Sequence, residues 1–341
     1  MSAVVGRGGV GRVGRTGAAL GGALVALSFA APLFRLAAPT PPLVAAGLRL
    51  ALAALLLLPS AVRAEAAGQF PKSHQGVAAV AGVFYALHFG AWVSSLTLTS
   101  VAASVTLVTC TPLLLGILGV ATGRDRPNGR FWLALAFSTA GLAIIGGTDL
   151  GALSDAAASP AALKGDALAL LGAFAIAGYF LTARRLSGSD ASVGRQPGGG
   201  ASVGRQPGGG ASVGRQPGGV PMNARAFSCA ATATGAALLL GTAAVLGMPL
   251  VPPTPQAALA IVACALVPQL MGHTLLTWAL RHTGPAWVAM TTVGEPVGAT
   301  LLTWWWLNEV PSALVLAGCA VTLVGVGVAL MATTRGQRAD V

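Results

Sequence analysis

Residues 285–307 read PAWVAMTTVGEPVGATLLTWWWL, an apolar run in which Glu295 is the only ionisable residue. A helix needs about 20 mainly apolar residues to cross the hydrocarbon core of a bilayer. Nine further runs of this kind occur in the chain, at 17–34, 41–58, 76–96, 100–122, 131–148, 165–183, 224–246, 256–280 and 311–332. Only helices and closed barrels satisfy their backbone groups in lipid, and these runs are too long for barrel strands. The sequence therefore predicts an all-α integral membrane protein with ten transmembrane helices.

The composition excludes a soluble fold, because only 9% of the 341 residues are charged whereas a soluble domain carries about 25%. The net charge of +11 is unevenly distributed. With the N-terminus in the cytoplasm, seventeen of the twenty Lys and Arg residues fall in cytoplasmic segments, and the outer loops carry Asp149, Asp155 and Glu309. This positive-inside pattern predicts a multi-pass protein of the cell (inner) membrane with both termini cytoplasmic. It accounts for the charge without a nucleic-acid partner.

No catalytic or metal-binding motif is present. Cys110, Cys229, Cys264 and Cys319 all lie inside apolar runs and form no CxxC pair, so neither a disulfide framework nor a metal site is indicated. The chain contains no HExxH, GxSxG or P-loop motif and no soluble domain that could hydrolyse ATP. We expect no enzyme, no cofactor and no metal, and any transport must be secondary.

The ten runs form two sets of five. The predicted units are a cytoplasmic tail at 1–16, a first half at 17–148, an outer linker at 149–164, a second half at 165–332 and a cytoplasmic tail at 333–341. Because five is odd, the second half must enter the membrane from the opposite side, and related halves would be inverted repeats. Weak symmetry supports this, since Thr109-Cys110-Thr111-Pro112 in the fourth run matches Val293-Gly294-Glu295-Pro296 in the ninth.

A short repeat of a different kind, with ten-residue units, lies between the sixth and seventh runs. Residues 191–219 read ASVGRQPGGG, ASVGRQPGGG and ASVGRQPGG. Such Gly, Pro and Arg units cannot build a core, so 187–223 is predicted to be a disordered cytoplasmic loop that interrupts the second half. A basic tail that touches lipid or a partner is one interpretation. A tolerated insertion without a role is the favoured one.

Glu295 is the strongest candidate for a functional residue. It lies roughly 15 Å into its run at 1.5 Å per residue, where an ionisable group costs at least about 2.5 kcal/mol and normally faces a cavity or a partner. Pro296 removes a backbone hydrogen bond beside it, so Pro112, Gly294 and Pro296 are candidate hinges. Glu295 is interpreted either as a site for a coupling proton or a cationic substrate group, or as a neutral clamp between helices.

Other polar side chains fall within the predicted spans. Arg49 lies in the middle of the second run and would pair with an anionic substrate, with Glu295 or with backbone carbonyls; we favour a structural role. His88 and His273 occupy the third run of each half, where they would shuttle protons, bind ligand or join helices. An aromatic and polar cavity could be lined by Tyr85, Trp92, Tyr179, Gln269 and Trp278.

The chain resembles the EamA type of the drug/metabolite transporter superfamily over nearly its whole length. The residues that carry the resemblance are PPLVAAGLR at 41–49, GEPVGA at 294–299, LNE at 307–309 with Gly318 and Gly325 after it, and Pro112 followed by Gly141 and Gly146. The chain departs from the family pattern at 123–126, GRDR, where a glutamate is expected. The resemblance implies a ten-helix basket with a central cavity between the halves, and export or uptake of small metabolites.

Together these features favour a secondary transporter that moves a small organic metabolite or drug by alternating access, with export as the favoured direction. The partners are a small-molecule substrate and the lipid bilayer. A coupling proton and a homodimer are left open. The alternatives are a membrane receptor or scaffold that does not transport, supported only by the 191–219 repeat, and a lipid-handling protein or intramembrane enzyme, for which no nucleophile or metal cluster is visible.

Overall fold

The computed structural model describes residues 6–99, 104, 107–123, 127–150, 159–185, 223–308 and 310–339, and these contain helices but no strand. The helices are α1 (Gly6–Ser28), α2 (Ala30–Ala37), α3 (Pro42–Ala66), α4 (Lys72–Ser95), α6 (Thr111–Thr122), α7 (Gly129–Leu150), α8 (Pro160–Arg185), α9 (Ala224–Val245), α10 (Pro255–Cys264), the π-helix η2 (Ala265–His273), α11 (Thr274–Ala279), α12 (Pro285–Thr292), α13 (Glu295–Leu307) and α14 (Ala313–Ala339). Each of the ten predicted runs therefore contains one of these helices or a helix broken into shorter segments.

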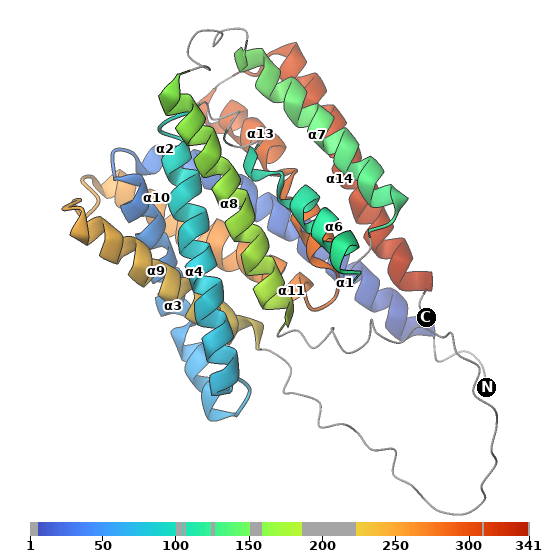
Figure 1. Cartoon of the computed structure of the whole chain (residues 1–341), viewed down its shortest axis with the longest axis horizontal. Helices are drawn as coiled ribbons and strands as arrows, with labels where there is room; N and C mark the ends of the chain where they lie inside the picture. The colour runs from blue at the N-terminus through green and yellow to red at the C-terminus, as the bar shows by residue number, and fades with distance from the viewer. Residues whose placement is uncertain are drawn as a thin grey trace, which may run out of the picture.

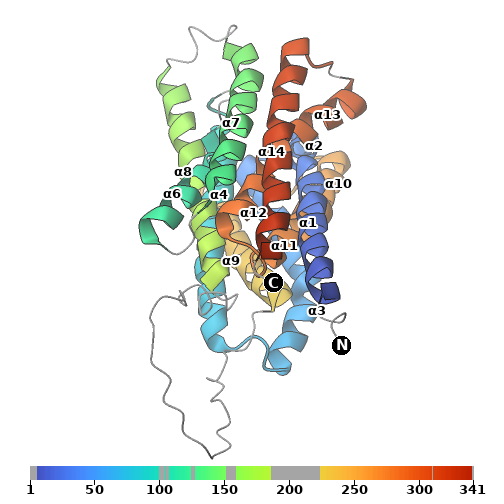
Figure 2. The same cartoon turned by 90° about the vertical axis from the view of Figure 1, so that its right-hand side faces the viewer.

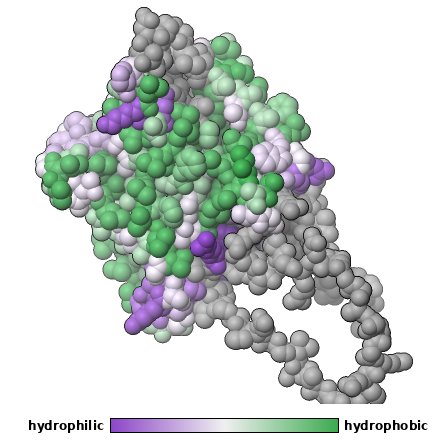
Figure 3. All heavy atoms as spheres, viewed as in Figure 1, coloured by the Kyte–Doolittle hydropathy of each residue, from purple (hydrophilic) through white to green (hydrophobic). Residues whose placement is uncertain are grey.

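The outer surface of the bundle is suited to lipid. Among the residues that the structure describes, six helical stretches are long and apolar enough to cross a membrane: Arg15–Ala37, Pro42–Ala66, Lys72–Ser95, Pro160–Arg185, Ala224–Val245 and Pro255–Ala279. Large apolar side chains point outward, and Leu55, Phe174 and Leu259 expose 63%, 58% and 70% of their surface. Figure 3 shows hydrophobic residues across the middle of one face and hydrophilic residues toward its margins. The chain is a multi-pass membrane protein, while a total of ten crossings stays a prediction.

Several helix boundaries differ from the predicted ones. Helix α1 begins at Gly6 and α14 ends at Ala339, so the expected tails 1–16 and 333–341 are partly helical. Helix α8 begins at Pro160, inside the expected linker 149–164, because Ser159 caps its first turn: the Ser159 hydroxyl accepts a hydrogen bond from the Ala162 amide at 3.1 Å. The repeat at 191–219 lies outside the described residues.

Helices of the two halves pack in matched pairs. Helix α3 packs on α9, α6 on α12 and α7 on α14, and each pair joins a helix of the first half to the one five runs later. Two further pairs are crossed. Helix α4, in the third run, packs on α8, in the sixth run, while α1, in the first run, packs on η2 and α11, in the eighth run. Figures 1 and 2 show α7 and α14 side by side along their length. Two related halves packed about a common axis would produce this pairing, and their inverted orientation stays a prediction.

Small residues allow the close packing of α7 on α14. A Cβ atom on Gly141 would lie 2.6 Å from the carbonyl oxygen of Gly318, and one on Gly325 would lie 2.6 Å from that of Ala134. Backbones that approach this closely gain dispersion contacts along the whole interface, which is the main source of helix association in lipid. The glycines Gly141, Gly318 and Gly325 therefore serve packing, away from the centre of the bundle.

Candidate functional site

Two helices are interrupted near the centre of the bundle, at the two matching motifs. In the second half, α12 ends at Thr292 and α13 begins at Glu295, with Pro296 in its first turn. In the first half a turn at Thr109 and Cys110 precedes α6, which carries Pro112 in its first turn. The N–H groups in the first turn of a helix have no hydrogen-bond partner inside that helix. A proline at this position, which has no N–H, therefore breaks no hydrogen bond. Pro112 and Pro296 therefore each lie in the first turn of a new helix, and their role as hinges stays a prediction.

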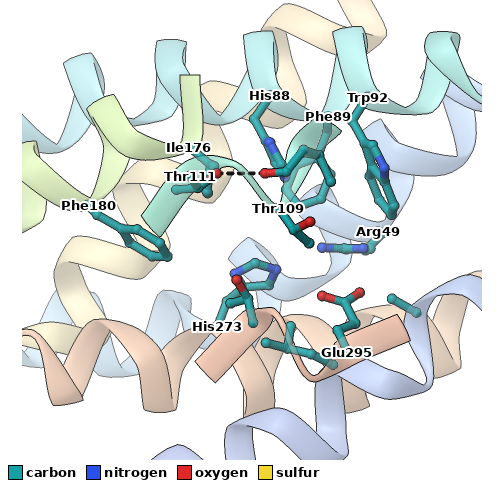
Figure 4. A pocket seen from close by; sticks show the side chains of 14 residues that line it. Arg49, His88, Phe89, Trp92, Thr109, Thr111, Ile176, Phe180, His273 and Glu295 are labelled. Atoms are coloured by element: carbon teal, nitrogen blue, oxygen red, sulfur yellow. Dashed lines mark hydrogen bonds between the residues drawn. The ribbon is translucent and has the colours of Figure 1, made fainter. Parts of the chain in front are cut away.

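A cavity of about 60 Å³ lies between these interruptions. Both halves line it, with the residues Leu27, Ala30, Arg49, His88, Phe89, Trp92, Val108, Thr109, Thr111, Ile176, Phe180, His273, Thr292 and Glu295. Figure 4 shows Arg49, Trp92 and Glu295 at one end and Ile176 and Phe180 at the other. Sites for organic ligands usually measure about 300–1,000 Å³. The cavity is therefore smaller than most such sites, and it has one polar end, at Arg49 and Glu295, and one apolar end.

Arg49 on α3 is held rigidly at the charged end. Its side chain exposes 1% of its surface, and its Nε and Nη2 donate to Oε1 of Gln269 at 3.2 Å and 2.8 Å. The guanidinium carbon lies 4.2 Å from the centroid of the Phe89 ring and 5.5 Å from that of Phe34, so cation–π attraction adds to the hydrogen bonds. Within the described part of the chain, Nη1 has no hydrogen-bond partner.

Glu295 faces Arg49 across the cavity. Figure 4 shows its carboxylate directed toward the guanidinium group. Among the residues that the structure describes, no ion pair joins the two and no donor is hydrogen-bonded to the carboxylate. When the Glu295 carboxyl group is ionised, its charge and that of the Arg49 guanidinium interact strongly, because the apolar surroundings screen them weakly. Such a pair is suited to bind a ligand with complementary charges.

His273 and Trp92 add unpaired nitrogens to the cavity, whereas His88 is paired. His88 Nδ1 lies 2.9 Å from the carbonyl oxygen of Gly172; because a carbonyl only accepts, Nδ1 carries the proton and joins α4 to α8. In the described chain neither Nδ1 of His273 nor Nε1 of Trp92 has a partner. The His273 ring packs edge-on against Tyr85 and Phe89, with centroids 5.5 Å and 5.8 Å apart.

The remaining predicted residues lie behind the lining or away from it. Gln269 on η2 supports Arg49, and its Nε2 lies 3.5 Å from the hydroxyl oxygen of Tyr85. Tyr179 stacks on Tyr85 with centroids 4.1 Å apart, and its hydroxyl lies 2.8 Å from Oγ1 of Thr277. Trp278 packs on His282 with centroids 4.1 Å apart and is not among the residues that line the cavity. Gln269 and Tyr179 are therefore supporting residues.

Sequence reasoning missed part of the lining. Phe89, beneath the guanidinium, follows His88 directly. The missed threonines belong to the two interruptions, since Thr109 and Thr111 lie within the first motif and Thr292 directly precedes the second. Closer attention to the polar residues of these motifs could have found them. The apolar wall residues Leu27, Ile176 and Phe180 carry no such signal, since a lipid-facing residue is equally apolar. Among the described residues no group of three His, Cys, Asp or Glu could hold a metal ion.

Comparisons with known proteins agree with this architecture. The model of the EamA-like transporter family matches residues 16–147 and 220–331, one stretch in each half. A solved crystal structure aligns with a TM-score of 0.72 at 17% sequence identity, covering 94% of this chain and 98% of its own. At that identity the likeness is one of fold alone. No curated protein sequence matches the chain.

Proposed function

This chain belongs to the EamA-like transporter family of the drug/metabolite transporter superfamily, and we propose that it is a secondary transporter that carries a small organic solute through the central cavity. Members of the family are membrane transporters. The proposal includes export as the direction of transport, the cell (inner) membrane as the location and a cytoplasmic position for both termini.

One observation carries the proposal: the interrupted helices of both halves meet at the cavity that contains Arg49 and Glu295. Helix interruptions at membrane depth are tolerated where they line a cavity, and they free backbone groups that can bind substrate or ions. The alternating-access mechanism moves one half against the other around such a fixed site. The small volume of the cavity, about 60 Å³, favours this mechanism over a permanently open pore.

The Glu295 carboxylate offers a route for coupling. A carboxylate can hold a proton or contact a cationic group of the solute, and the two exclude each other. Exchange of one for the other would couple outward movement of solute to inward movement of protons. The proposal therefore predicts that an inward proton gradient accelerates export.

Flux in proteoliposomes tests the function. Vesicles that contain the purified chain are loaded with radiolabelled amino acids, nucleosides or cationic drugs, and a proton gradient is imposed in either direction. We expect saturable release of one solute class, faster when the release compartment is acidic. Binding of a solute without flux in either direction would identify a receptor and overturn the proposal.

The orientation is tested separately with Arg205→Cys in a chain whose native cysteines are replaced. We expect this cysteine to react with an impermeant reagent in inverted vesicles and to be protected in intact cells. Labelling of intact cells would reverse the proposed orientation.

A further inference from the structure

The connection between α9 and α10, residues 246–254, is apolar and uncharged. It reads LGMPLVPPT, and residues 226–280 contain no Lys, Arg, Asp or Glu. Val245, Leu246 and Val251 expose 87%, 60% and 75% of their surfaces. A group of apolar side chains exposed to this degree marks contact with another protein or with a membrane.

The matching connection of the first half has the opposite character. Residues 67–71 join α3 to α4, five runs earlier, and the exposed residues Glu65 and Lys72 flank them. The side-chain oxygen of Gln69 accepts a hydrogen bond from Nδ2 of Asn223 at 3.1 Å. Charged and amide side chains of this kind are suited to water. The apolar composition of 246–254 is therefore not a requirement of joining two helices.

The backbone of the α9–α10 connection offers few hydrogen-bond donors. An N–H group without a partner is costly in lipid. The amides of Leu246, Gly247 and Met248 donate to carbonyl oxygens at the end of α9, at 3.0 Å, 3.0 Å and 2.9 Å. Residues 249, 252, 253 and 255 are proline and have no N–H. Three bonded amides and four prolines leave at most three free N–H groups in the ten residues 246–255.

The lipid-facing surface of the bundle continues into this connection. Leu238 on α9, and Leu259 and Val262 on α10, are exposed apolar side chains on the two adjoining helices. Helix α9 has 22 residues and is therefore about 33 Å long, little more than the ~30 Å hydrocarbon core. It begins beside the exposed Arg225, and it is inclined to α4 (Figure 1). Its far end thus reaches only the opposite boundary of the core.

We propose that the α9–α10 connection lies within the bilayer, at the boundary between headgroups and acyl chains, with Leu246, Leu250 and Val251 in contact with phospholipid acyl chains. Apolar side chains are favourable at this depth, and interfacial water can still donate to the backbone carbonyls. The contact anchors the hairpin whose second arm leads through α10 to Gln269, the partner of Arg49. This inference requires only that the chain spans a membrane and does not depend on transport.

Collision measurements on two spin labels test the position of the connection. Val251→Cys and Ala67→Cys are made in a chain whose native cysteines are replaced, labelled with a nitroxide and placed in lipid nanodiscs, which leave both membrane faces in water. Ala67, exposed in the matching connection, is the control. Oxygen concentrates in hydrocarbon and a nickel chelate stays in water. We expect oxygen collisions to dominate at 251 and nickel collisions to dominate at 67.

Two other results would overturn the proposal. Dominant nickel collisions at both positions would place the connection in water. Few collisions with either reagent at 251 would mean that protein covers it, as in contact with a second copy of the chain or another protein.

A charge in the connection gives an independent measurement. Val251 is largely exposed and packs little within the chain, so Val251→Asp should be nearly neutral if the connection lies in water. In contact with acyl chains a carboxylate is costly. We therefore expect Val251→Asp to lower the unfolding temperature in nanodiscs by about 2 °C or more relative to Val251→Ala, which removes the same packing without adding charge. Equal unfolding temperatures of these two variants would argue against contact with acyl chains.

Discussion

The two interrupted helices at the cavity share a backbone plan and differ in the residue at its first position. Helices α6 and α13 both begin after a short turn and both carry proline second. At the first position, Thr111 in α6 exposes 2% of its surface and donates its hydroxyl to the Val108 carbonyl at 2.8 Å and to the Ala173 carbonyl at 3.4 Å. Glu295 in α13 instead directs its carboxylate into the cavity (Figure 4). The first half closes its interruption with a neutral hydrogen bond, while the second half presents an ionisable carboxyl group there.

The same asymmetry extends to the neighbouring helices. Twenty-seven residues before each proline, the first half has Tyr85 and the second half has Gln269, and these two side chains meet beside the cavity. Only Gln269 binds Arg49. The two matched positions therefore differ in role: Gln269 binds the Arg49 guanidinium, whereas Tyr85 packs beside it.

The largest expected effect is that of Glu295→Gln on coupled transport. Glutamine preserves the shape of the side chain but cannot ionise, so it cannot exchange a proton for solute. We expect gradient-driven flux to fall to the level of empty vesicles, while exchange at saturating solute continues and membrane insertion stays normal. Radiolabelled flux at pH 6 to 8 is the measurement. Wild-type gradient-driven flux in this variant would show that Glu295 serves only as a helix clamp.

Much of the fold was predictable from sequence because a span is defined by a long apolar run, and each of the ten runs contains helix. The position of Glu295 and Arg49 at the cavity was also predictable, because an ionisable residue within a membrane-spanning run is costly and normally faces a cavity or a partner. The structural role favoured for Arg49 stays a prediction: two of its nitrogens bind Gln269, while Nη1 has no partner among the described residues.

The interruptions were not predictable in the form they take. The turn at Thr109 and Cys110 contains neither glycine nor proline, so the sole local signal for it is Pro112, in the first turn of the helix that follows. The π-helix η2 surrounds Pro268 and brings Gln269 to Arg49, but proline in a helix usually signals only a kink. These features depend on packing between distant segments, which sequence periodicity does not contain.

The next effect concerns Gln269, which should matter more than its counterpart Tyr85. Gln269→Leu leaves Nε and Nη2 of the buried guanidinium unpaired and should cost about 2–3 kcal/mol of stability. Tyr85→Phe removes a hydroxyl whose contact with Gln269 is long, at 3.5 Å, and which leaves no charged group unpaired, so it should cost less than about 1 kcal/mol. Thermal unfolding of both variants in nanodiscs measures the difference. Equal losses would mean that the two positions support the site alike.

A smaller effect is expected where α13 meets α1. A Cβ atom on Gly298 would lie 2.5 Å from Cβ of Ser28, so α1 and α13 would have to separate. Gly298→Ala should therefore destabilise the chain by about 1–3 kcal/mol, the range for overpacking. The control is Gly327→Ala in α14, where a Cβ atom would meet nothing within 4 Å. That control should be neutral or slightly stabilising. If both variants unfold at the same temperature, the close contact between α1 and α13 is not required.

The smallest effect is expected for Thr111→Val, the first-half counterpart of the Glu295 substitution. Valine has nearly the shape of threonine and removes only the hydroxyl, whose partners are the carbonyls of Val108 and Ala173. Loss of one such neutral hydrogen bond costs about 1 kcal/mol, so the unfolding temperature should fall slightly. Coupled flux should stay within about twofold of wild type, a change of less than about 0.5 kcal/mol, because no ionisable group is removed. Flux and thermal unfolding, measured on the same preparation as Glu295→Gln, give the direct comparison. Loss of proton coupling in Thr111→Val would mean that both interruptions take part in the proton step, and that the division of roles between the two halves is wrong.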